Sequence, residues 1–170
     1  YTNGTACFVG ANITATNCTF KAIEENSASA YLASAANYTF NNCSFEGSGG
    51  IYIKAGTLTL NNCNITATGD ESTGSYNSNG ANLTGAGITI DSAYNYNTSN
   101  NKMIVTINGG NITSATNYAV YEISTAPTTE QLRCYAVVSI SESTILSSPK
   151  TEAVKSENNV ISTISVWDGS

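Results

Sequence analysis

The sequence predicts an all-β chain that folds as a single-stranded, right-handed parallel β-helix (a solenoid), with about five to six coils and three short strands per coil. Three observations favour this fold. A short motif recurs along the chain, and its apolar residues alternate with polar ones at the period of two of a half-buried strand. No segment keeps the 3.6-residue apolar period of a helix. Asn and Thr, both weak helix formers, fill the windows where a helix could lie.

The recurring motif reads apolar, polar, apolar, two small polar residues, a small residue, polar, apolar. Residues 38–45 (YTFNNCSF) and 58–65 (LTLNNCNI) match position for position, and residues 13–20 form a third copy. Residues 105–112 and 138–145 are weaker copies. Asn tolerates a left-handed backbone and bonds its own main chain, so the central Asn pair predicts a tight corner. Each copy is therefore strand, corner and strand, and not a hairpin.

A further short strand precedes most copies of the motif. These segments are residues 30–32, 51–53, 88–90, 120–123 and 153–154. With Tyr31, Tyr52, Thr89, Tyr121 and Lys155 as equivalent positions, the spacings are 21, 37, 32 and 34 residues. Because a bare coil needs only about 20 residues, the later coils are expected to carry inserted loops. The longest loops are expected at residues 66–86, 91–102 and 124–133.

Three copies of the motif also carry a resemblance to known proteins. Residues 40–45 (FNNCSF), 60–65 (LNNCNI) and 107–112 (INGGNI) resemble the coil motifs of pectin-lyase-like parallel β-helix proteins. They are particularly similar to the repetitive, adhesin-like surface proteins of gut bacteria and archaea, and the resemblance covers most of residues 8–166. It implies the fold. It leaves the activity open, because this superfamily includes lyases, hydrolases, phage tailspikes and adhesins.

Charge is scarce in this chain. Its 170 residues include 6 basic and 12 acidic side chains, with a net charge of −6 and no His, whereas Asn, Thr and Ser supply 66 residues. Such a chain has no basic surface for nucleic acid or for an anionic membrane, and no apolar run is long enough for membrane insertion. We therefore expect one domain over residues 1–170, extracellular or on a bacterial cell surface, as a piece of a longer protein with flanking domains.

Two sets of corner residues are expected to be structural. Cys18, Cys43 and Cys63 share one place in the motif, which predicts an internal ladder of small thiols stacked coil over coil. A straight line of thiols cannot enclose a tetrahedral ion, so no metal is expected there. Stacked Asn side chains should bond one another along the coils. This Asn ladder consists of Asn41, Asn42, Asn61 and Asn62. Cys7 and Cys134 lie outside the thiol ladder, and their redox state stays open.

Tyrosines of the first strands form the candidate binding surface. Tyr31, Tyr52 and Tyr121 are expected to point outward between inward apolar neighbours, near loops that carry further tyrosines. The loop tyrosines are Tyr76, Tyr94 and Tyr96. Sugar rings stack on aromatic faces while amides and hydroxyls bond their hydroxyl groups, so glycans or a cell-surface protein are the expected partners. Alternatively, the tyrosines form a cross-coil ladder that only stabilises the sheet.

Catalytic groups are too few for the lyases and hydrolases of this superfamily. A lyase would need an Arg or Lys base with clustered Asp ligands for calcium, but Arg133 is the only Arg and the three Asp residues lie in separate segments. A glycosidase needs two carboxylates over one cleft. Asp70 and Glu71 are interpreted as a solvated loop tip. Glu122, expected to be half-buried beside the outer face of the first strands, is the remaining carboxylate of interest. We therefore expect a non-catalytic adhesin or stalk module without cofactors, with a polysaccharide-degrading enzyme and a purely structural spacer as alternatives.

Overall fold

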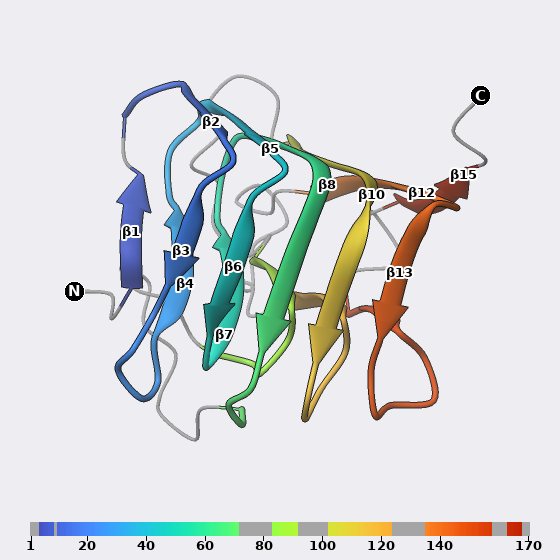
Figure 1. Cartoon of the computed structure of the whole chain (residues 1–170). Coiled ribbons are helices and arrows are strands. Elements are labelled where there is room, and N and C mark those ends of the chain that lie inside the picture. The colour runs from blue at the N-terminus through green and yellow to red at the C-terminus, as the bar shows by residue number, and fades with distance from the viewer. Residues whose placement is uncertain are drawn as a thin grey trace, which may run out of the picture.

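The computed structural model describes residues 4–8, 10–71, 83–91, 102–123, 135–157 and 163–167 (Figure 1). These ranges form strands and turns and contain no helix. The strands are β1 (Gly4–Phe8), β2 (Ile13–Thr16), β3 (Thr19–Lys21), β4 (Ala28–Leu32), β5 (Asn37–Asn41), β6 (Ser44–Gly47), β7 (Gly49–Ile53), β8 (Thr57–Ala67), β9 (Ile88–Asp91), β10 (Lys102–Ser114), β11 (Val120–Ile123), β12 (Tyr135–Ser141), β13 (Thr144–Ser147), β14 (Val154–Ser156) and β15 (Thr163–Trp167).

The strands form two parallel sheets. The six-stranded sheet has the order β1-β4-β7-β9-β11-β14. The nine-stranded sheet follows the path β2-β5-β8-β10-β12-β15. In addition, β6 pairs with the second half of β8, β3 pairs with β6, and β13 pairs with the second half of β10. Figure 1 shows β3, β6, β8, β10 and β13 side by side in one layer. The predicted all-β fold with parallel pairing is therefore confirmed for the described residues.

The register of the six-stranded sheet confirms the predicted equivalent positions. Tyr31 pairs with Tyr52, Tyr52 with Thr89, Thr89 with Tyr121, and Tyr121 with Lys155. Each pair joins strands that are 21 to 37 residues apart in the chain. The apolar alternation is sufficient to set this register, because a slip by one residue would move every inward side chain to the other face.

The corners use left-handed backbone at the places where the motif has Asn. Asn17, Asn42 and Asn62 have φ angles of 56°, 50° and 51°, and Gly109 takes the same place in the fourth copy with a φ of 73°. Asn is one of the few residues with a side chain that enters this region readily, and glycine enters it without steric cost. The predicted strand, corner and strand arrangement is confirmed at these copies, where β8 and β10 run continuously through the bend.

The fifth copy departs from the predicted frame by one residue. Ile112 pairs with Leu146 and not with Ile145, whose side chain is 64% exposed. Leu146 packs against the core in its place. Glu142 stands where the other copies have Asn or Gly, and it has no positive φ. Because a left-handed residue is missing, the turn takes one additional residue, which shifts every later side chain by one position.

The main core lies between the two sheets and receives the inward residues of both. Ile51 and Ile53 of β7 join Leu58 and Leu60 of β8 in one buried cluster. Of the predicted thiol ladder, Cys43 and Cys63 are buried in this core, whereas Cys18 is exposed, so the expectation of an internal thiol is wrong at Cys18. All three thiols are free. Of the predicted Asn ladder, Asn41 and Asn61 bond one another, with Asn61 donating to Asn41 Oδ1 at 2.8 Å, and Asn108 continues the row by donating to Asn61 Oδ1 at 2.8 Å. Asn42 and Asn62 form the left-handed corners instead.

Candidate functional site

The outer face of the six-stranded sheet, which points away from the main core, is covered where the first tyrosines lie. Tyr31 and Tyr52 turn outward, as expected, but they are only 5% and 1% exposed. Their ring centroids lie 5.9 Å apart, and both rings pack with Leu83 and Ile123 in a second apolar cluster. The expectation of an open aromatic surface is therefore wrong at these two positions. The aromatic rings bury one another and their neighbours, because packing releases water from their large apolar area.

A buried polar cluster lies beside Tyr52 on this outer face. The Tyr52 hydroxyl donates a hydrogen bond to Asp91 Oδ2 at 2.7 Å. Lys54 Nζ lies 3.4 Å from the same oxygen, and the side chains of Lys54 and Asp91 are both 0% exposed. Lys54 Nζ also lies 5.8 Å from the centre of the Tyr52 ring. The Tyr52 hydroxyl and the Lys54 amine therefore both lie next to one carboxylate oxygen of Asp91, at a place closed to water.

Burial and charge act in opposite directions on Lys54. Burial lowers the pKa of the Lys54 ammonium below its usual range, and the negative charge and hydrogen bond of Asp91 oppose this shift. A buried ion pair contributes little net stability, since the cost of desolvating both charges offsets their attraction. Removing one partner would leave the other charge buried without compensation. Packing alone therefore does not account for the presence of this pair.

Two aligned sequence segments could have revealed the Lys54–Asp91 pair. Residues 51–54 (IYIK) and 88–91 (ITID) share the same alternation, and Ile53 pairs with Ile90 in the sheet. Lys54 and Asp91 follow these two residues directly, so opposite charges lie side by side on neighbouring strands. Clustering of Asp residues in the sequence gives no sign of this pair, because Lys54 and Asp91 become neighbours only through the pairing of β7 with β9.

A network of hydroxyl and amide groups holds the chain next to this cluster. The Thr84 and Thr89 hydroxyls lie 2.7 Å apart, and Thr84 Oγ1 also accepts the backbone N–H of Ala86. The Asn117 side chain donates to the backbone oxygen of Thr84. These groups are buried. Because each group is hydrogen-bonded, these contacts fix the segment around Thr84, which includes Leu83 of the second apolar cluster.

An accessible aromatic pair lies further along the same outer face. The ring centroids of Tyr118 and Tyr121 lie 5.0 Å apart at an angle of 57°, and both side chains are half-buried. Lys150 Nζ lies 5.9 Å from the centre of the Tyr118 ring, and the Tyr121 hydroxyl donates to Glu157 Oε1. We call these four residues the Tyr118–Tyr121 platform. Burial, followed by the Glu157 hydrogen bond and charge and the Glu71 charge, raises the pKa of Tyr121.

Glu122, the carboxylate of interest in the sequence, points to the opposite side of the sheet. It pairs in register with Ile90, an inward residue of the main core, and is fully buried. The Ser156 hydroxyl donates to Glu122 Oε2 at 2.5 Å. The expectation of a half-buried carboxylate beside the outer face is therefore wrong. The sheet separates Glu122 from Asp91, so these two carboxylates cannot act on one substrate.

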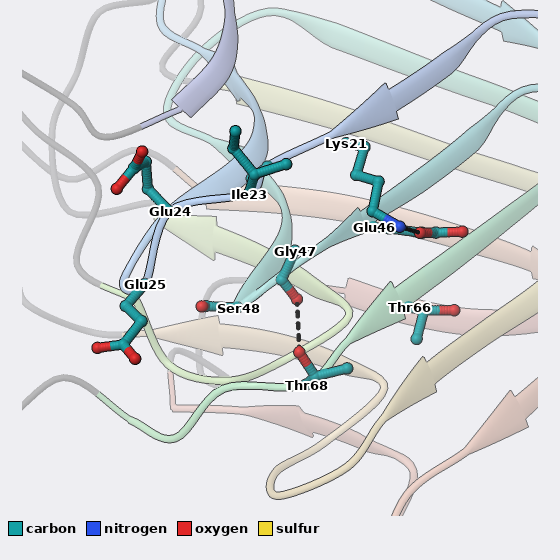
Figure 2. A pocket seen from close by; sticks show the side chains of 10 residues that line it. Lys21, Ile23, Glu24, Glu25, Glu46, Gly47, Ser48, Thr66 and Thr68 are labelled. Carbon is teal, nitrogen blue, oxygen red and sulfur yellow. Dashed lines mark hydrogen bonds and ion pairs between the residues drawn. The ribbon is translucent and has the colours of Figure 1, made fainter.

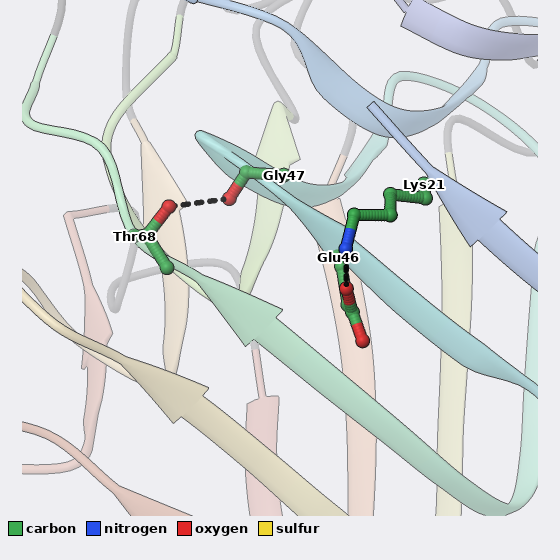
Figure 3. A network of polar contacts seen from close by, with 4 residues as sticks. All are labelled: Lys21, Glu46, Gly47 and Thr68. Atoms are coloured by element: carbon green, nitrogen blue, oxygen red, sulfur yellow. Dashed lines mark hydrogen bonds and ion pairs between the residues drawn. The ribbon is translucent and has the colours of Figure 1, made fainter. Parts of the chain in front are cut away.

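An open cleft of about 320 Å³ lies beside the C-terminal ends of β3, β6 and β8 (Figure 2). It is lined mainly by Lys21, Ile23, Glu24, Glu25, Glu46, Ser48, Thr66 and Thr68. Figure 3 shows the ion pair of Lys21 Nζ with Glu46 Oε2 at 2.8 Å, and the Thr68 hydroxyl donates to the Gly47 carbonyl. Ile23 is 84% exposed at the cleft. No aromatic side chain lines it, so it offers hydrogen bonds and charge without a surface for ring stacking.

Several predicted residues lie outside the described part of the chain. They are Tyr76, Tyr94, Tyr96, Arg133 and Cys134. The backbone of Cys7 pairs in register with Tyr31, so Cys7 belongs to the column of first-strand residues. Within the described ranges, no group of three or more Cys, Asp or Glu side chains is placed to hold a metal ion, and no helix is long and apolar enough to cross a membrane.

Comparison with known proteins finds no relative of this chain. No protein-family model matches the chain, and no curated protein or solved structure matches it.

Proposed function

We propose that this chain is a right-handed parallel β-helix that acts as a rigid, non-catalytic module of a cell-surface protein and binds glycans. The two parallel sheets with a shared core support the β-helix, because a chain that alternates between them builds one coil on the next. The scarcity of charge and the abundance of Asn, Thr and Ser support a secreted or bacterial cell-surface location. Rigidity follows from coil stacking, since each coil packs on its neighbours.

The observation that carries glycan binding is the Tyr118–Tyr121 platform. Two half-buried rings lie together beside one basic and one acidic side chain. Sugar rings pack on aromatic faces, while nearby charged groups bond sugar hydroxyls. This arrangement takes over the role first expected of Tyr31 and Tyr52, because their rings are covered.

A glycan-array screen tests this proposal. The wild-type module should bind at least one class of glycan, and a Tyr118→Ala, Tyr121→Ala double variant should lose that signal. A Tyr135→Ala variant is the matched control, because Tyr135 is a half-buried tyrosine on the nine-stranded sheet. If the wild type binds no glycan, the spacer alternative is favoured. Binding that survives in the double variant would exclude this platform as the site.

A polysaccharide-degrading enzyme is the second candidate, favoured by the convergence of Tyr52, Lys54 and Asp91. A lysine whose pKa is lowered by burial is suited to act as a base. Against this candidate, the side chains of Lys54 and Asp91 are closed to solvent, so a polymer cannot reach them in this conformation. Depolymerisation of pectin or mucin glycans by the wild type, abolished by Lys54→Met, would favour the enzyme over the binding module.

A further inference from the structure

The buried side chains of Lys54 and Asp91 supply an amine and a carboxyl group, which can condense to an amide with the loss of one water molecule. Its two side chains come from neighbouring strands, with Nζ 3.4 Å from Oδ2 and no exposure to solvent. The Tyr52 hydroxyl donates to the same carboxylate oxygen. We propose that Lys54 and Asp91 are joined by an intramolecular isopeptide bond that forms within the folded chain. This inference does not depend on glycan binding.

The reaction requires both groups in their neutral forms. A protonated amine has no lone pair, so the Lys54 proton must first pass to the Asp91 carboxylate. Burial favours this transfer, because two charges that lose contact with water are costly and two neutral groups are not. The lowered pKa of Lys54 acts in the same direction.

The bond-forming step then balances without any further reactant. The Nζ lone pair attacks Cγ of Asp91, and the N–C bond forms as negative charge develops on Oδ2. Tyr52 stabilises this charge through its hydrogen bond. The C–O bond to the other oxygen breaks, and this oxygen leaves as water with its own proton and one proton from nitrogen. One amine and one carboxylic acid therefore become one amide and one water.

A second Lys–carboxylate pair in the molecule provides a comparison. Lys21 Nζ lies 2.8 Å from Glu46 Oε2, which is closer than in the buried pair. Its two side chains are 61% and 48% exposed, so water keeps both groups charged and the amine unreactive. The Lys21–Glu46 hydrogen bond also raises the pKa of Lys21. Distance alone therefore does not select the reactive pair, whereas burial and a hydroxyl donor do.

The bond would fasten neighbouring strands of the six-stranded sheet across a long stretch of chain. Lys54 directly follows β7, Asp91 ends β9, and residues 55–90 lie between them. A covalent link at this point would prevent β7 and β9 from separating under load. This property suits a rod that is pulled along its length.

Intact-mass spectrometry of the folded wild-type protein tests the inference directly. We expect a mass lower by one water molecule than the sequence requires. A glutamate-specific protease cuts the denatured chain after Glu46, Glu71 and Glu122, which places Lys54 in peptide 47–71 and Asp91 in peptide 72–122. These two peptides should stay joined, and Lys21 and Glu46 should remain unlinked. If the folded wild-type protein has the full sequence mass and the two peptides separate, the proposal is overturned. Because this test uses only the wild type, it does not depend on whether a variant folds.

Two variants separate the chemistry from the fold. Lys54→Arg keeps the positive charge but removes the nucleophile, so the protein should show its full sequence mass. Tyr52→Phe keeps the ring but removes the hydroxyl donor, and it should lower the rate at which the linked form accumulates by about 100-fold. A linked mass that persists in Lys54→Arg would place the bond elsewhere and contradict the assignment to this pair.

Discussion

At the scale of single residues, the corners depend on backbone conformations that few amino acids adopt. Asn42 and Asn62 enter the left-handed region, and Gly109 serves the same place in the fourth copy. This use of Asn was predictable, because its short side chain tolerates left-handed backbone. Where Glu142 replaces it, the turn takes an additional residue. The residue at the corner of each copy of the motif therefore decides the register of the strand that follows.

Asn42 is a clean test of this requirement, because its side chain is exposed while its φ is 50°. We expect Asn42→Val to be less stable than Asn42→Gly by about 1–2 kcal/mol, since a side chain that branches at Cβ is strained in left-handed backbone and glycine is not. Urea unfolding followed by circular dichroism measures the difference. Ser44→Val, in strand β6, is the control and should change stability little. Equal stability of the two Asn42 variants would contradict the role of φ.

Tyr121 predicts a dependence of stability on alkaline pH. Its pKa is raised from the ordinary value of 10.0, so the folded protein holds the phenol proton more tightly than the unfolded chain does. The resulting stabilisation is complete below pH 10 and is lost as the pH rises further. We expect the unfolding free energy of the wild type to fall more steeply above pH 10 than that of Tyr121→Phe. Urea unfolding at a series of pH values above 10 measures this difference. If the unfolding free energies of the wild type and Tyr121→Phe fall equally with pH, the expectation is contradicted.

At the scale of elements, the alternation in the sequence was sufficient to predict the register of the first strands, but it did not predict the one-residue shift at β13. The equivalence of Tyr31, Tyr52 and Tyr121 is confirmed. Their burial was not predictable from alternation, because the pattern shows which face a side chain takes and not what covers that face. Leu83, which packs on Tyr31 and Tyr52, lies within the loop expected at residues 66–86, and the sequence carries no signal of this contact. The accessible site therefore lies at Tyr118 and Tyr121.

The Asn ladder predicts a stabilising substitution at its C-terminal end. Asn108 donates to Asn61, but its buried Oδ1 accepts no hydrogen bond from the described residues. Ser141 lies next to it on β12, at the place where an Asn would continue the ladder. Gly109 N–H, which bonds Ser141, also has Thr144 Oγ1 as an acceptor. We expect Ser141→Asn to raise the unfolding free energy by about 0.5–1.5 kcal/mol.

A double-mutant cycle assigns this gain to the ladder. In an Asn108→Ser background the same Ser141→Asn change should give no gain, because the acceptor is missing. Both comparisons use thermal and urea unfolding. An equal gain in the two backgrounds would show that the introduced amide side chain acts through strand propensity or other contacts.

At the scale of the whole molecule, stability is expected to spread from each strand to the strands paired with it. Strands pair with their equivalents in the adjacent repeats, so a local change reaches distant strands only through intermediate ones. Strands β1, β3, β5 and β6 contribute a cluster of aromatic rings to the core. Phe40 lies with ring centroids 6.1, 5.6 and 5.1 Å from Phe8, Phe20 and Phe45. This cluster has no aromatic counterpart among the core residues contributed by β10 and β12.

Phe40→Ala therefore tests how far coupling extends. Removing this buried ring should lower the unfolding free energy by about 3–5 kcal/mol, since a cavity replaces its contacts. Nearest-neighbour coupling predicts that hydrogen exchange accelerates most in β2, β5 and β8 and least in β12 and β15. Val166→Ala, at a position that is 62% exposed, is the control and should leave exchange unchanged. Uniform acceleration along the chain would mean that the sheets open as one cooperative unit, because then every strand exchanges through global unfolding.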